Sequence, residues 1–487
     1  MPSRSHLLDA VRSQRRLDEF VSWLKQHSGT RISPGLQIEV LSASAGRGRL
    51  VPASDLNDGD EIFAIPRDLV LMVENSQLNR HISQKLAELG TWLSLIVVMI
   101  HEHLQGDKSP WAPYFSVLPW NFDTLMFWSD SELSELQASA ILKQIGKADA
   151  EKSIVDMVVP IVRAHPELFP PTNAGVLSFE GENGVKKLVE LAHRMGSLIM
   201  AYGFDIEKPD EDGEGEDGYI TDEEEQLPKG MVPLADFLNG DAHRSNVRLF
   251  QEDTCLVMRA IKPIKAGDEL FIDYGELPRA ELLRKYGHVP ESYAQYDVAE
   301  VPLTLLCRAA GLESSNPDEQ PPLKLLDELE ILEDGYCIPR PSAEDKLAEI
   351  LPDELLALLK TLTLSPEQLA KYQSKNRPPS PSLGSAEAQL LLEALQARLA
   401  EYPTTLQQDE AILADLPSAA NSLSDDRSAV RRRMAIEVRI GEKQVLHRIR
   451  EMTSALISSL DVASSNKRPA SSDLNEQTTK AAKIQDS

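Results

Sequence analysis

Three short stretches of this 487-residue chain contain residue types that are useful in a reactive site. The first is the turn Gly46-Arg47-Gly48, where the absence of Cβ permits close approach of the backbone to another group. The second ends in Asn239-Gly240. The third contains Tyr274, and Tyr286 follows twelve residues later. A tyrosine can orient an amine through its hydroxyl and face a cation with its ring. Taken singly, each stretch is typical of an ordinary turn, cap or strand, so their order and spacing carry the information.

The sequence contains no candidate residues for several other common types of enzyme reaction. It has no P-loop, no HExxH motif, no GxSxG elbow and no spaced histidine cluster. The formal dinucleotide pattern at residues 213–218 lies among carboxylates that would repel a phosphate. Calcium-loop spacing from Asp210 places Thr221 where a bidentate Glu is required. Because the three cysteines, Cys255, Cys307 and Cys337, form no CxxC pair, we predict no metal site.

The composition restricts the partners of the chain. Its 50 basic and 77 acidic residues give a formal net charge of −27, which excludes binding to nucleic acid by charge alone. We expect a basic protein as the partner instead. The N-terminus lacks the apolar core of a signal peptide. The longest apolar run, residues 92–100, is too short to cross a bilayer. These features predict an intracellular protein with no membrane partner.

The periodicity of apolar residues predicts a β-rich unit that is split by a long helical insertion. A first helix ends near Gln26. Strand-like runs follow at 37–41, 49–51, 61–65 and 69–72, and return at 247–251, 255–261 and 269–272. The insertion spans about residues 76–202, with helices predicted over 85–103 and 185–202. A helix after Pro278 is expected to end at a glycine cap, Gly287.

Helices are predicted to dominate the rest of the chain. Leucine-rich faces occur at 323–332, 343–362, 386–402 and 428–460, and an exposed loop is expected at 374–384. Between Asp205 and Glu225, 12 acidic residues and one lysine give a local charge of −11, which is typical of a solvated loop. The polar end from about residue 464 lacks periodicity, and we predict that it is disordered.

Together, these stretches resemble SET-domain protein lysine methyltransferases. The resemblance is carried by Ala45–Pro52 (AGRGRLVP), by Met231–Asn239 (MVPLADFLN) with Asn246 after it, and by Ile264–Gly275 (IKAGDELFIDYG). Ser109–Pro119, the helical insertion and the helical end of the chain resemble the Rubisco large-subunit methyltransferase branch. Within that branch the similarity is greatest to the fungal ribosomal-protein lysine N-methyltransferases. The resemblance covers residues from about 15 to 460.

The resemblance implies an α+β fold. A β-rich SET catalytic domain is expected over residues 15–290, with its helical insertion at about 76–202 and an acidic loop at 205–227. An all-helical substrate-binding domain is expected over 300–460, followed by a disordered tail over 464–487. Because no cysteine-rich zinc cluster follows Tyr274, the helical domain would have to close the lysine channel.

The resemblance also implies a reaction. The implied cofactor is S-adenosylmethionine, and the acceptor is a lysine amine. A lysine ammonium, with a reference pKa of about 10.4, must lose its proton before it can attack. A narrow apolar channel would desolvate it and lower that pKa. Tyr274 matches the catalytic tyrosine of the family. Residues matching cofactor contacts are Gly46, Arg47, Gly48, Asn239, Gly240, Tyr274 and Tyr286, and residues matching the lysine channel are Tyr202 and Asp236.

One departure from the family pattern leaves two kinds of function open. The family commonly reads Asn-His where this sequence reads Asn239-Gly240. Glycine keeps the backbone contacts to the cofactor but loses the packing of the histidine. We expect a methyltransferase acting on a basic protein, with a ribosomal protein of the large subunit favoured over a histone or another nuclear protein. The alternative is a catalytically weak SET-fold scaffold that binds basic nuclear proteins.

Two pairs of basic residues near the end of the chain bear on its location. Lys467-Arg468 and the pair Lys480 and Lys483 resemble a two-part nuclear localisation signal. We therefore expect the protein in the nucleus, the cytoplasm or both, with the nucleus favoured.

Overall fold

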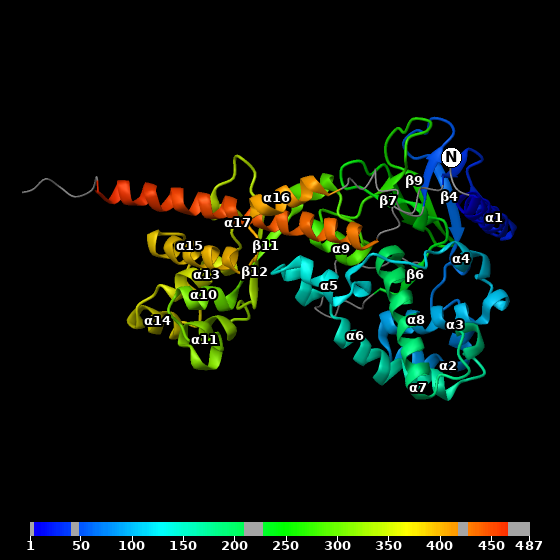
Figure 1. The fold of residues 1–487 in the computed structure, drawn as a ribbon, viewed down its shortest axis with the longest axis horizontal. Coiled ribbons are helices and arrows are strands. Elements are labelled where there is room, and N and C mark those ends of the chain that lie inside the picture. The colour runs from blue at the N-terminus through cyan, green and yellow to red at the C-terminus, as the bar shows by residue number, and fades with distance from the viewer. Residues whose placement is uncertain (1–3, 40–47, 209–226, 417–426, 466–487) are drawn as a thin grey trace, which may run out of the picture. The chain divides into compact units, whose positions relative to one another are not determined.

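The computed structural model describes residues 4–39, 48–208, 227–416 and 427–465. The chain divides into two compact units (Figure 1). The first unit contains residues 1–296 and 411–438, and the second contains residues 297–410 and 439–487. Most of the predicted acidic loop and nearly all of the predicted tail lie outside the described residues, as do Gly46 and Arg47.

A four-stranded antiparallel sheet, in the order β1-β4-β9-β8, forms the largest sheet of the first unit. Its strands are β1 (Arg31–Ile32), β4 (Glu61–Pro66), β8 (Val247–Gln251) and β9 (Cys255–Ala260). β4 has the sequence EIFAIP, and all its residues after the first are buried. Pro66 pairs with Cys255, so strands that are far apart in the sequence lie side by side.

Three two-stranded sheets complete the strand content described for the first unit. β2 (Leu36–Glu39) pairs with β3 (Arg49–Pro52), β5 (Gly203–Asp205) with β6 (Lys229–Met231), and β7 (Asn239–Gly240) with β10 (Phe271–Ile272). The first two pairs are antiparallel and the third is parallel.

The strand predicted at 69–72 is wrong. Residues 67–69 form a 3₁₀ turn, and Leu71 makes only an isolated bridge to Met231. The side chain of Asn75 donates to the carbonyl oxygens of Arg67 and Val70, at 2.7 and 2.8 Å. In a sheet, these two carbonyl oxygens would be available to accept hydrogen bonds from a neighbouring strand. Here they accept from Asn75 instead, and the segment is held in a turn.

Helices form the insertion between β4 and β5, as the periodicity predicts. They are α2 (Gln77–Ala87), α3 (Gly90–Gln105), α4 (Ala112–Val117), α5 (Asp130–Leu133), α6 (Lys147–Ser153), α7 (Val159–Ala164) and α8 (Gly181–Tyr202), and α1 (Arg4–Gln26) precedes β1. The single helix predicted over 85–103 is in fact two, because α2 ends at Ala87 and Gly90, the first residue of α3, adopts φ +69°. Figure 1 shows α8 running close to α3, and the two helices pack together.

One continuous apolar core ties the helices of the first unit to its sheet. Phe20 and Leu24 of α1, Phe63 of β4, Leu95 of α3 and Leu198 of α8 are all fully buried in it. After the sheet, α9 (Arg279–Tyr286) ends as predicted at Gly287, which adopts φ +77°. The core therefore fixes the position of α8, which ends at Tyr202, whereas Leu283 of α9 is buried in a separate apolar cluster with Leu125 and Trp128.

The second unit is mainly helical, as the sequence predicts, and it also contains one strand pair that the sequence analysis missed. β11 (Val298–Pro302) and β12 (Gly335–Pro339) are antiparallel. The helices are α10 (Leu303–Ala309), α11 (Pro321–Asp327), α12 (Leu347–Ile350), α13 (Asp353–Leu362), α14 (Pro366–Gln373) and α15 (Ser385–Ala400). The helix predicted over 343–362 is interrupted at Pro352, because proline disfavours helical backbone in the residue before it.

Two helices contribute residues to both units. They are α16 (Leu406–Asp415) and α17 (Arg427–Ser465). The observed division therefore differs from the predicted domain boundaries, since residues 411–438 belong to the first unit. Within the described ranges, the helices are too short or too polar to cross a bilayer.

The part of α17 in the second unit buries a charged cluster. Asp409 is fully buried and lies 2.8 Å from the guanidinium of Arg439. It also pairs with the ammonium of Lys443, which is equally buried, and accepts a hydrogen bond from Thr404 at 2.8 Å. Burial would raise the pKa of Asp409, but the hydrogen bonds from Arg439, Lys443 and Thr404 lower it. The carboxylate is thus held in its charged form.

Candidate active site

The short parallel pair β7–β10 brings together two of the stretches that the sequence analysis selected. Asn239 is in register with Phe271, and Gly240 with Ile272. The backbone N–H of the next residue, Asp241, donates to the carbonyl oxygen of Ile272 at 3.0 Å. Since Tyr274 follows β10 by two residues, this pairing positions the backbone that carries its ring.

The side chain of Asn239 connects the first stretch, the glycine turn, to this pair. Its Nδ2 donates to the carbonyl oxygen of Gly48 at 3.2 Å and to Oε1 of Glu269 at 2.6 Å. Glu269 also lies 3.8 Å from Arg49, the first residue of β3. Of the predicted turn, Gly48 is therefore at the site, whereas Gly46 and Arg47 lie outside the described residues.

Tyr274 and Tyr286 form an aromatic pair beside Asn239 and Gly240. Their ring centroids are 4.3 Å apart and their planes differ by only 5°. The hydroxyl of Tyr274 lies 3.4 Å from the carbonyl oxygen of Leu238, a long hydrogen bond. A Cβ on Gly287 would meet the backbone of Asp123 at 2.9 Å. The glycine that ends α9 therefore permits a close packing that also holds Tyr286.

Gly240 lies against the face of the aromatic pair. An ideal Cβ built on this glycine would fall within the ring of Tyr274, with Cδ2 and Cγ as its nearest neighbours. Any other residue at position 240 would therefore have to displace the ring. The departure from the Asn-His pattern thus has a defined structural role, because the ring of Tyr274 uses the space that a side chain would fill.

The two residues predicted to line a lysine channel also come close to Tyr274. Tyr202 is the last residue of α8, and Asp236 is buried in a 3₁₀ turn over Ala235–Phe237. Both are near enough for their charges to contribute to the raised pKa of Tyr274. Four predicted residues from four separate segments are therefore gathered at one place.

The hydroxyl groups of Tyr274 and Tyr286 are held in their neutral form. Burial raises the pKa of Tyr274 well above its ordinary value of 10, and the neighbouring Tyr286 raises it further. Burial also raises the pKa of Tyr286 to about 12. Both tyrosines are therefore protonated at neutral pH, where they can donate a hydrogen bond but cannot serve as a general base.

Two residues that the sequence analysis did not select hold the loop after Gly240. The hydroxyl of Tyr293 accepts a hydrogen bond from the backbone N–H of Ala242 at 2.7 Å. Asp241 accepts from the backbone N–H groups of His243 and Arg244, at 3.0 and 2.9 Å. Burial would raise the pKa of Asp241, but these hydrogen bonds and the Arg244 side chain lower it. An aspartate directly after a glycine is a turn signal that marks Asp241, whereas Tyr293 has no comparable signal.

Two family models match the chain one after the other. The SET domain model matches residues 48–275, and the Rubisco LSMT substrate-binding model matches residues 320–446. N-lysine methyltransferase setd6 of Xenopus tropicalis is 30% identical over 471 residues, which cover 90% of this chain and 95% of that protein. The chain belongs to the SET-domain protein-lysine N-methyltransferases.

Other relatives in this methyltransferase family agree. Ribosomal lysine N-methyltransferase 4 of Saccharomyces cerevisiae is 34% identical over 307 residues, which cover 61% of this chain and only 60% of that protein. A solved structure of the SET domain of LSMT bound to lysine and AdoHcy superimposes with a TM-score of 0.64 at 19% identity. That match covers 92% of this chain and 93% of the other, and it supports the fold of both parts.

The methyl donor of this family is S-adenosylmethionine, and the residues at the site fit its chemistry. The side-chain Nδ2 of Asn239 donates its hydrogens to Gly48 and Glu269 within the protein. The carbonyl oxygen of the same side chain is the atom that can accept a hydrogen bond from an ammonium group. The faces of the tyrosine pair provide an environment that favours a cationic sulfonium.

Proposed function

We propose that this methyltransferase modifies a lysine of a ribosomal protein, with the large subunit as the favoured source. The observation that carries the proposal is the 34% identity over 307 residues with the yeast enzyme named for ribosomal lysine methylation. The charge of the chain agrees with it, because a protein of net charge −27 attracts basic partners. We further propose that the protein works in the nucleus, on the basis of Lys467-Arg468, Lys480 and Lys483, which lie outside the described residues.

We assign roles to the site residues on the same basis. S-adenosylmethionine supplies an electrophilic methyl group, and the lysine amine attacks it from the side opposite the sulfur. Tyr274, neutral because burial raises its pKa, accepts or donates a hydrogen bond at the amine and aligns it. Tyr202 and Asp236 line the channel in which the amine loses its hydration and its proton. The residues that we assign to cofactor binding are Gly46, Arg47, Gly48, Asn239, Gly240 and Tyr286.

The lysine ammonium gives its proton to solvent water, without help from a tyrosine base. Since the pKa of Tyr286 is about 12 and that of Tyr274 lies well above 10, neither hydroxyl is ionised at neutral pH. Desolvation of the ammonium is then the main effect that lowers the lysine pKa. Asp236 opposes that effect through its negative charge, and we propose that it orients the ammonium before deprotonation.

The names of other relatives leave the substrate class open. N-lysine methyltransferase setd6 of Xenopus laevis is 27% identical over 480 residues, covering 92% of this chain and 97% of that protein, and its name specifies no ribosomal target. A histone or another basic nuclear protein is therefore the second candidate. The scaffold alternative is disfavoured by family membership and by the gathering of Tyr202, Asp236, Tyr274 and Tyr286.

The test is methyl transfer from labelled S-adenosylmethionine to three acceptors: large ribosomal subunits, small ribosomal subunits and core histones. We expect label on a single protein of the large subunit, with a mass gain of whole methyl groups on one lysine. Tyr274→Phe keeps the ring stack and is expected to lower kcat by about 10²–10³-fold. Its dissociation constant for the cofactor should stay close to that of the wild type.

The outcomes separate the candidates. Label on histones alone would refute the ribosomal substrate and retain the methyltransferase. Equal labelling by wild type and Tyr274→Phe would refute the role assigned to Tyr274. Nuclear exclusion of a fluorescent fusion would refute the proposed location.

A further inference from the structure

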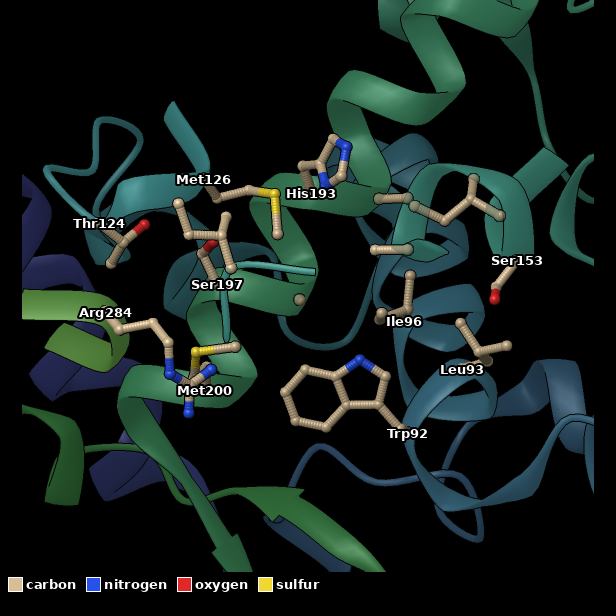
Figure 2. A pocket seen from close by; sticks show the side chains of 15 residues that line it. Trp92, Leu93, Ile96, Thr124, Met126, Ser153, His193, Ser197, Met200 and Arg284 are labelled. Atoms are coloured by element: carbon tan, nitrogen blue, oxygen red, sulfur yellow. The ribbon is translucent and has the colours of Figure 1, made fainter. Parts of the chain in front are cut away.

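A pocket of about 580 Å³ in the second unit is polar and positively charged. It contrasts with a cavity of the first unit, which is lined mainly by apolar side chains such as Trp92, Ile96 and Met200 (Figure 2). The walls of the second-unit pocket come mainly from α13, α14 and α15 and from the segment that joins α14 to α15. Its lining has a net charge of +3, from four basic residues and one acidic residue: Lys360, Lys371, Lys375, Arg377 and Glu387. This charge is opposite in sign to the net charge of the chain, −27.

Three of these four cations have no counter-ion in the described part of the chain. Lys360 lies 2.8 Å from the carboxylate of Glu387, so these two charges offset each other. The charged groups of Lys371, Lys375 and Arg377 pair with no carboxylate among the described residues, and all three residues are exposed. Such a group of cations attracts anions, and phosphate oxygens form strong charge-assisted hydrogen bonds with lysine and arginine.

The segment between α14 and α15 begins and ends at this pocket. Arg377 and Ser385 both line the pocket, so the residues between them start and finish at its walls. Within the segment Pro379 is buried, whereas the next residue, Ser380, is exposed. The segment is therefore anchored beside the pocket and presents Ser380 to solvent.

Ser380 is followed by Pro381, and a proline directly after a serine is the feature that proline-directed protein kinases recognise. The dipeptide alone does not select this position, because three other serines of the chain also precede a proline. These are Ser33, Ser109 and Ser365.

The structure holds the other three serines in place. The hydroxyl of Ser109, a residue that is 5% exposed, donates to Glu102 at 2.7 Å. The hydroxyl of Ser365 caps α14 and accepts from the backbone N–H of Gln368 at 3.3 Å. The backbone N–H of Ser33 donates to a carbonyl oxygen of β4 at 2.8 Å. Each would have to leave these partners before it could enter the active site of a kinase.

Ser380 has no such restraint. Neither its backbone nor its hydroxyl makes a hydrogen bond to another described residue. The structure has no helix or strand over residues 377–384. Arg377, Pro378 and Ser380 each precede a proline, which favours extended backbone. An exposed, extended segment is the form in which a kinase binds its acceptor, so the structure favours Ser380 among the four serines.

We propose that Ser380 is a phosphorylation site and that its phosphate binds the pocket cations Lys371, Lys375 and Arg377. A proline-directed serine kinase catalyses the step, and ATP is the donor. The bond from the γ-phosphorus to its bridging oxygen breaks, a bond to Oγ of Ser380 forms, ADP leaves, and the hydroxyl proton passes to a base of the kinase. The phosphate carries a charge of about −1.5 to −2 at pH 7, so the modification offsets much of the positive charge of the pocket.

The first experiment compares the full chain with four synthetic peptides, one for each Ser-Pro pair. The kinase is chosen because it labels all four peptides from labelled ATP. In the full chain we expect at least tenfold more label on Ser380 than on any other of these serines, as located by mass spectrometry. Equal or greater label on another Ser-Pro serine, or a full chain without label, would overturn the proposal.

Variants of the full chain locate the signal. Ser380→Ala and Pro381→Ala should each lower labelling at least tenfold. The matched control is Ser382→Ala, which changes an exposed serine of the same segment that no proline follows, and it should keep the label. Labelling that persists in Ser380→Ala would overturn the proposal.

The second experiment measures the second pKa of the phosphate by ³¹P NMR, in the phosphorylated chain and in the phosphorylated peptide of residues 374–384. This pKa is about 6 in a free phosphoserine, and nearby cations lower it. The peptide contains Lys375 and Arg377, so a difference between chain and peptide reports contacts made by the fold. We expect the pKa in the chain to be lower by about 0.5. Equal values would overturn the binding of the phosphate to the pocket.

Lys371→Gln removes a cation that lies on α14, outside the peptide. It should recover at least half of the difference in pKa between chain and peptide. The matched control, Lys346→Gln, removes an exposed cation elsewhere in the second unit and should recover none of it. Equal effects of the two variants would place the phosphate outside the pocket and overturn the proposal. Neither experiment depends on the substrate of the methyltransferase.

Discussion

The ring of Tyr274 occupies the space in which a side chain at Gly240 would begin. The two residues lie on neighbouring segments that the β7–β10 pair holds in register, so this contact is built into the sheet. The ring lies against the backbone of residue 240, and it is nearly parallel to the ring of Tyr286. The sequence analysis noted Gly240 only as a loss of packing, whereas the structure uses the missing side chain to place the tyrosine.

Gly240→Ala should displace Tyr274 from its stack on Tyr286. We expect kcat to fall by about tenfold or more, because small displacements of a positioning group are costly in rate. The free energy of unfolding should fall by about 1–3 kcal/mol, as in other overpacked sites. Steady-state kinetics and urea denaturation measure the two effects. Gly35→Ala is the control, because a Cβ there meets only ordinary contacts, the nearest at 3.6 Å. An active, fully stable Gly240→Ala would contradict the proposed packing.

Asn239→Asp should weaken cofactor binding more than Asn239→Ala does. The substitution replaces the Nδ2 donor with an acceptor that faces the carbonyl oxygen of Gly48 and the carboxylate of Glu269. Lost hydrogen bonds and like-charge repulsion should together cost about 2–3 kcal/mol. Calorimetric titration with S-adenosylmethionine checks the order of the two variants. The exposed Asn183→Asp adds the same charge elsewhere and should leave the affinity unchanged.

The raised pKa of Tyr286 predicts a loss of stability in strong base. In the unfolded chain this hydroxyl ionises near pH 10, whereas in the folded protein its pKa is about 12. Between these values the folded state holds the proton and the unfolded state does not, so stability falls as the pH rises. The loss attributable to this group is on the order of 2 kcal/mol between pH 10 and 12. Tyr286→Phe should show a shallower decline over that range in urea denaturation, and parallel curves for the two proteins would refute the assignment.

Asp409→Asn should destabilise the second unit. Removing this charge takes a buried counter-ion away from Arg439 and Lys443, which costs about 3–5 kcal/mol in comparable sites. Chemical denaturation should show a lower midpoint for the variant. The matched control is Glu349→Gln, which breaks the exposed pair with Lys346 and should change little. A control that costs as much as Asp409→Asn would show that burial is not the reason.

Much of the fold follows from periodicity and turn residues. The ends of α1 and α9 lie where the sequence predicted them, and α9 ends at Gly287 because its positive φ suits glycine. The failures have local causes. Asn75 holds the segment after β4 in a turn through side-chain hydrogen bonds, which a hydrophobic pattern does not register. The strand pair β11–β12 was missed because both strands lie among leucine-rich helical segments.

The sequence selected candidate residues for the site but could not give the contacts among them. The resemblance selected four residues that the structure brings together from four segments, namely Tyr202, Asp236, Tyr274 and Tyr286. Local patterns could not show that Asn239 binds Gly48, because these residues are 191 positions apart in sequence. The hydrogen bond from Ala242 to the hydroxyl of Tyr293 was missed for the same reason, because the two residues are 51 positions apart in sequence.

The pairing of β4 with β9 has a consequence for synthesis of the chain. Pro66 is paired with Cys255, so 189 residues (255 − 66) separate the partners. At about 5–20 residues per second, a ribosome needs roughly 10–40 s between them. Throughout that interval the apolar strand EIFAIP has only the two-residue strand β1 as a neighbour in the sheet and lacks β9, and the helical insertion is made first. The nascent chain must therefore shield β4 from aggregation, and a long-range closure of this kind predicts slow folding.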